Sequence, residues 1–117
     1  MRGLQLISPA NSAPNFNPST LKVLAGNKTW REFLSEGNAF LFQAREKAKN
    51  NQANACYACF RAGQKFKIAI DLANKSALSS KPDISREEYL SILQGMEAAR
   101  HLEIAIMQNA FSSFKRD

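Results

Sequence analysis

Two cysteines three positions apart, Cys56 and Cys59, form the pattern in this sequence whose residue types and spacing could best perform chemistry. A C-x-x-C pair supports redox chemistry where it opens a helix, because the helix N-terminus lowers the thiol pKa. It supports zinc binding where further Cys or His ligands complete a set of four. Here the pair falls inside an alanine-rich helical segment, there is no third cysteine, and the only histidine is His101. We therefore expect both cysteines to be small core residues.

The remaining polar residues do not assemble a catalytic pattern. His101 follows Glu97 by one helical turn, which predicts a local pair on a helix. Glu87 and Glu88 are adjacent, so on a helix their side chains point about 100° apart and suit a helix N-terminus better than acid–base work. The glycines are isolated rather than gathered into a phosphate-binding loop. The sequence thus predicts a protein that is not an enzyme, with no metal, no cofactor and no small-molecule substrate.

Cysteine usage and the start of the chain bear on the cellular compartment. Two unpaired thiols in a chain this short are typical of a reducing compartment, which favours the cytoplasm. No acidic residue precedes Glu32, and a start rich in Ser and Asn without acids is also typical of an organelle transit peptide. Organelle import therefore stays open beside the cytoplasm. No apolar run approaches the ~20 residues of a membrane span.

The positive charge is the global feature that points to a partner. The chain has a net charge of +6, and residues 45–75 hold seven basic and two acidic residues. Basic side chains on one helix face can contact nucleic-acid phosphates, but lysines spaced among apolar positions are also typical of a solvated face, and an acidic protein partner explains the same charges. The candidate anion or nucleic-acid contacts are Arg45, Lys47, Lys49, Arg61, Lys65 and Lys75.

The elements that position these basic residues are helices of a single domain. A chain of 117 residues has room for a single core. Residues 1–18 contain repeated prolines and asparagines, which predicts an extended polar arm. A single helical-bundle domain is expected from 19 to 117, beginning with a short helix over residues 20–25 that Gly26 ends.

Three long helices follow from apolar residues at three- and four-residue spacing. Thr29 with Glu32, and Ser85 with Glu88, form capping boxes that predict where the first and third helices begin. The second helix is expected from about residue 53 to 78. No segment alternates with period two, so the fold class is all-α, an antiparallel bundle of three long helices. The expected core consists of Trp30, Phe33, Leu34, Phe40, Leu41, Cys59, Phe66, Ala69, Ile70, Ile92, Met96, Leu102 and Ile106.

The last helix carries more apolar surface than such a bundle can cover. Beside one apolar stripe that includes Ile106 and Ala110, a second stripe follows at helical spacing. Uncovered apolar stripes mark partner surfaces. We therefore expect a non-catalytic protein–protein interaction module, an oligomer or a small helical adaptor or chaperone of the kind that serves secretion machines. Nucleic-acid binding by the basic segment is the alternative. The candidate partner-binding residues are Ile104, Met107, Phe111 and Phe114.

Overall fold

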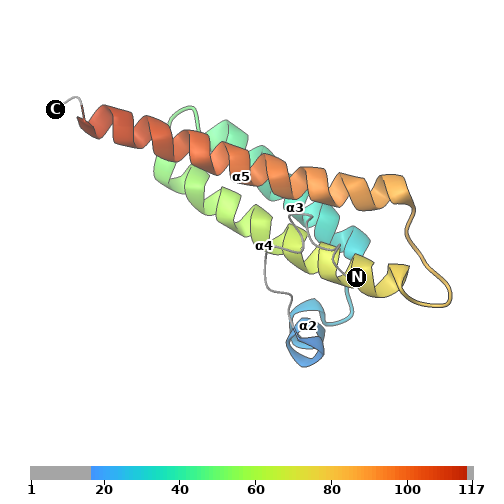
Figure 1. Cartoon of the computed structure of the whole chain (residues 1–117). Coiled ribbons are helices and arrows are strands. Elements are labelled where there is room, and N and C mark those ends of the chain that lie inside the picture. The colour runs from blue at the N-terminus through green and yellow to red at the C-terminus, as the bar shows by residue number, and fades with distance from the viewer. Residues whose placement is uncertain (1–16, 116–117) are drawn as a thin grey trace.

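The computed structural model of the chain describes residues 17–115, with side chains from 17 to 112, and this part is an all-α bundle without a strand. The predicted fold class is confirmed. The arm over residues 1–16 lies outside the described residues, and Pro18, predicted to end that arm, instead begins the first described helix. The helices are α2 (Pro18–Ala25), α3 (Trp30–Lys47), α4 (Gln52–Ala77) and α5 (Arg86–Lys115) (Figure 1).

Side-chain caps fix where the long helices begin. The backbone N–H of Glu32 donates to Thr29 Oγ1 at 3.3 Å, and the N–H of Thr29 donates to Glu32 Oε1 at 2.8 Å. Ser85 and Glu88 exchange the same two bonds at the start of α5, at 3.1 and 2.8 Å. Both predicted capping boxes are therefore formed, and they satisfy N–H groups that the first helical turn leaves unpaired.

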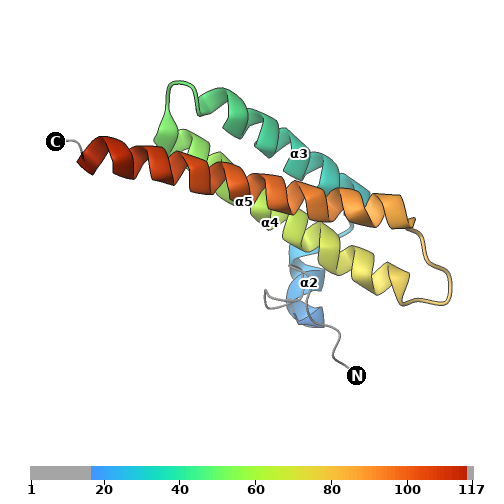
Figure 2. The same ribbon diagram turned by 45° about the horizontal axis from the view of Figure 1, so that its top comes forward.

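Each long helix runs antiparallel to the one before it, and α4 packs against both α3 and α5 (Figures 1 and 2). The Phe66 side chain of α4 is fully buried, and its ring lies against Gly37 of α3 and Gly95 of α5. The predicted core residues are buried, except for four that are half-buried and pack against the core. These four are Leu34, Phe40, Met96 and Leu102.

The short helix α2 covers part of α4 on the side away from α5 (Figure 1). Leu21 and Ala25 of α2 are buried in one cluster with Ile68 of α4. At the start of α3, Trp30 Nε1 donates to the carbonyl of Asp83 at 3.2 Å, and Arg31 Nη1 donates to its carboxylate at 3.0 Å. These contacts attach the α4–α5 loop to α3.

The C-terminal end of α5 extends beyond the turn that joins α3 to α4 (Figures 1 and 2). Ile106, with 4% of its surface exposed, is the last residue of α5 that is buried within the described side chains. The nine residues that follow it correspond to about 13 Å of helix at 1.5 Å per residue. None of the described helices combines the length and the apolar character that a membrane crossing requires.

Candidate protein-binding face

Exposed apolar side chains of α4 and α5 lie beside one another where the two helices pack together. Cys56 Sγ of α4 lies 3.9 Å from Met107 Sδ of α5. Phe60 follows Cys56 by one helical turn, and Ile104 and Phe111 flank Met107 at three and four residues, so each set shares one side of its helix. Because α4 and α5 are antiparallel, Phe60 lies at the level of the turn of α5 that contains Ile104. We call these five residues the α4–α5 face.

The large side chains of the α4–α5 face are open to solvent. Phe60 is 55% exposed, Ile104 44%, Met107 43% and Phe111 62%. At roughly 200 Å² for each large apolar side chain when fully exposed, the four together leave on the order of 400 Å² of apolar surface uncovered. A patch of this size is comparable to the largest on ordinary monomers, and such patches are often functional.

The two apolar stripes predicted on the last helix differ in burial. Ile106 is buried against Ala44, Ala55, Ala58 and Cys59, whereas the Ile104–Met107–Phe111 stripe is exposed. The side chain of Phe114, the fourth candidate, lies outside the described residues. Sequence reasoning did not include Phe60 in the site, although its spacing from Cys56 was a usable signal.

The cysteines sit in apolar surroundings rather than in a reactive site. Cys59 is 2% exposed, and burial, with Glu103 nearby, raises its pKa to about 11. Burial also raises the pKa of Cys56, which is half-buried at the edge of the face. A raised pKa keeps both thiols protonated near neutral pH, and the thiolate is the form that attacks or binds metals. Within the described part of the chain, no three Cys, His, Asp or Glu side chains are close enough to hold a metal ion.

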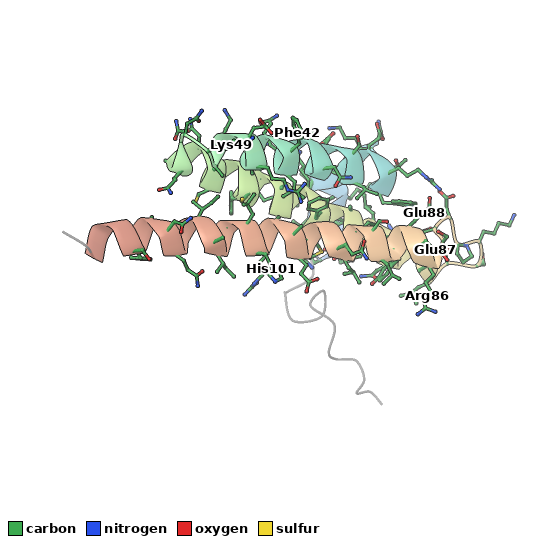
Figure 3. All side chains as sticks on the ribbon, turned by 90° about the horizontal axis from the view of Figure 1, so that it is seen from above. Phe42, Lys49, Arg86, Glu87, Glu88 and His101 are labelled. Carbon is green, nitrogen blue, oxygen red and sulfur yellow. The ribbon has the colours of Figure 1, made fainter. Side chains whose placement is uncertain are left out.

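The acidic and histidine residues of α5 do not converge. His101 is exposed and projects away from the other long helices (Figure 3). The expected pair between His101 and Glu97 is not formed: the ion pairs of the described residues do not include one between these two side chains. Glu87 and Glu88 lie in the first turn of α5, where negative charge suits the helix N-terminus.

The six candidate basic residues are spread along the bundle. Arg61 donates to Tyr57 Oη at 3.1 Å, and its guanidinium lies 5.0 Å from the centre of the Phe40 ring. Lys65 Nζ is 3.1 Å from Glu36 Oε1, with 20% of its side chain exposed. Their charges are thus engaged within the chain. The other four are exposed at opposite ends of the bundle: Arg45, Lys47 and Lys49 lie near the α3–α4 turn (Figure 3) and Lys75 near the end of α4.

An open depression of about 530 Å³ lies beside the α4–α5 loop. Tyr89 Oη donates to Asn74 Oδ1 there at 2.6 Å, and burial raises the pKa of this tyrosine. The hydroxyl hydrogen of Tyr89 is therefore used within the chain and is not directed at a ligand. The lining residues are Asn74, Ala77, Leu78, Pro82, Ile84, Ser85, Arg86, Tyr89 and Leu90.

Comparison with known proteins does not assign this chain to a family. No protein-family model matches the sequence, and neither the curated proteins nor the solved structures contain a significant match. The interpretation of the α4–α5 face therefore rests on its own chemistry. Four of the ten large apolar side chains that are exposed in the described residues belong to it.

Proposed function

We propose that this protein is a non-catalytic protein-interaction module whose α4–α5 face binds a helical protein surface. One observation carries the proposal: Phe60, Ile104, Met107 and Phe111 gather on adjacent helices, yet remain exposed while the core beneath them is filled. Apolar side chains at helical spacing on two adjacent helices form a surface against which a third helix can pack.

The exposed apolar surface is large enough to contribute substantially to binding. At about 25 cal/mol per Å², covering roughly 400 Å² of apolar surface contributes on the order of 10 kcal/mol before costs are counted. Association costs about 4–15 kcal/mol in lost freedom of motion. Stable binding therefore requires a partner that contributes a comparable apolar surface of its own.

A role as a small adaptor or secretion chaperone is compatible with this proposal. Proteins of those classes have a similar size and an all-helical character, which is a likeness of type and not of motif. The thiols with raised pKa and the scattered carboxylates support a role that does not involve catalysis.

Site-specific photo-crosslinking of the full chain in its native cells tests the proposal. A benzoylphenylalanine is placed at position 111 or 60 of the α4–α5 face, and at position 42 as the control. Phe42 is 63% exposed, close to the 62% of Phe111, but it projects from α3 away from α5 (Figure 3). We expect a discrete adduct with an identified protein from 111 and 60 and none from 42. Equal adducts at all three positions, or none at any, would contradict the proposal.

The nucleic-acid alternative has its own measurement. Binding of DNA and RNA at low salt is compared between the natural chain and a variant with Arg45, Lys47 and Lys49 changed to Ser. Binding that falls steeply with salt and requires these residues would favour the alternative, because phosphate contacts release counterions. We expect no such dependence, since Arg61 and Lys65 are engaged within the chain and Lys75 lies at the opposite end of the bundle from the other three.

A further inference from the structure

We infer that the occupant of the α4–α5 face is a second copy of this chain, with the two α5 helices packed antiparallel across a two-fold axis. The inference rests on the proposed function and names its partner. It also explains why the exposed stripe lies toward the C-terminal end of α5, which is the end that extends past the α3–α4 turn.

The spacing of the stripe is that of a helix-pairing seam. Ile104, Met107 and Phe111 are separated by three and four residues, which is the alternation that places side chains against a partner helix. The same alternation continues backward through Arg100 and Glu97, where charge replaces apolar surface. The apolar part of the seam is therefore short and lies at the C-terminal end of α5.

An antiparallel pair aligns this short seam with itself. With the two-fold axis passing between residues 105 and 106, Ile104 packs against Met107 of the second copy, and each contact occurs twice. Arg100 then lies opposite Phe111 of the second copy. A closed two-fold interface of this kind is the commonest way for one chain to cover its own apolar patch.

Arg100 supplies a complementary group for the exposed aromatic ring. It is exposed on α5, one turn before Ile104, and it forms no ion pair with any other described residue. A guanidinium placed over a phenyl face is attracted to the ring, while its aliphatic stem covers apolar surface. The register thus gives Phe111 a cover that its own bundle does not provide.

The available area matches a small interface. The four apolar side chains offer on the order of 400 Å² per copy, or about 800 Å² for the pair. Interfaces of about 1,200–2,000 Å² are roughly 60% apolar, which corresponds to about 700–1,200 Å² of apolar surface. The pair reaches the lower end of that range, where weak and reversible interfaces are found, so we expect reversible dimerisation.

Sedimentation of the full chain and of charge variants at position 111 tests this register. Phe111→Lys and Phe111→Glu remove the same apolar surface, but only lysine meets Arg100 of the second copy with like charge. We expect the natural chain to dimerise and Phe111→Lys to weaken dimerisation about tenfold more than Phe111→Glu, since each tenfold is about 1.4 kcal/mol. Adding Arg100→Glu should reverse that order.

Controls at Phe42 correct for the change in net charge. Phe42→Lys and Phe42→Glu alter the same charges on an equally exposed phenylalanine of α3, and both should leave dimerisation near that of the natural chain. Equal weakening by the two Phe111 variants after this correction would overturn the antiparallel register. A natural chain that stays monomeric at high micromolar concentration would overturn the inference. The proposed function would still stand in that case if crosslinking from position 111 captured a different protein.

Discussion

The ring of Phe66 lies so close to Gly95 that a methyl group at position 95 would approach its Cε1 to 2.5 Å. Gly37 of α3 lies equally close to the ring, since a methyl carbon added at position 37 would lie 2.7 Å from Cε1 of Phe66. Neither glycine has a positive φ, since Gly26 alone has one among the described residues. The two glycines therefore provide space for the fully buried ring, which lets α3 and α5 approach α4 at its centre.

Gly95→Ala should destabilise the fold although alanine favours helices. The helix gains about 1 kcal/mol from the substitution, but overpacking a filled core costs about 1–3 kcal/mol. We expect a net loss of about 1 kcal/mol in the free energy of unfolding, measured by urea denaturation. Gly63→Ala is the matched control, because nothing lies within 4 Å of its added methyl group, and it should gain about 0.5–1 kcal/mol.

The clash at position 95 should depend on the ring it meets. In a double-mutant cycle, Phe66→Leu should cost less free energy of unfolding in the Gly95→Ala background than in the natural chain. Strict additivity of the two substitutions, or a stabilised Gly95→Ala variant, would show that the contact is not tight in solution.

Glu36 should make stability depend on pH in the acid range. The ammonium of Lys28, 2.7 Å from Glu36 Oε2, together with Lys65, lowers the pKa of this carboxyl below its ordinary 4.5. A lowered folded-state pKa stabilises the fold above the unfolded-state pKa, and the contribution is lost as the pH falls through the folded-state pKa. Urea denaturation from pH 7 to pH 3 should therefore show a smaller loss of stability in Glu36→Gln than in the natural chain.

Removing Lys28, the nearer of the two lysines that contact Glu36, tests the same effect from the other side of the ion pair. Lys28→Gln should reduce the same acid-range dependence, because it removes the shorter of the two contacts with Glu36. An unchanged pH dependence in both variants would mean that other carboxyl groups determine acid stability.

The two cysteines should differ sharply toward a thiol reagent. With its pKa raised to about 11 and 2% of its surface exposed, Cys59 should be alkylated by iodoacetamide only after unfolding. Cys56 should react slowly in the folded protein, because it is half-buried and its pKa is also raised. Mass spectrometry of peptides from native and urea-unfolded samples measures both rates. Rapid alkylation of Cys59 in the native protein would contradict its place in the core.

The sequence predicted the features that depend on local patterns. The capping boxes at Thr29 and Ser85 set helix starts correctly, and the apolar spacing identified the buried Phe33 and Ile92. The slot that Gly37 and Gly95 form for Phe66 was not predictable, because it depends on how three helices are placed relative to one another.

The candidate site was predicted only in part for the same reason. The stripe of Ile104, Met107 and Phe111 was visible from spacing within one helix, whereas Phe60 joins it from α4. The availability of two basic residues was predicted wrongly for a similar reason. Arg61 and Lys65 looked available along the sequence, but their partners, Phe40 and Glu36, come from α3.

Amide hydrogen exchange at low and high protein concentration tests most directly whether copies of the chain meet through the α4–α5 face. Exchange should slow at high concentration in residues 104–112 of the natural chain, because helix pairing reduces local opening. It should stay unchanged around Phe42, and the slowing should disappear in Phe111→Lys. Exchange in residues 104–112 that is the same at every concentration, or slowing centred on Phe42, would contradict the account.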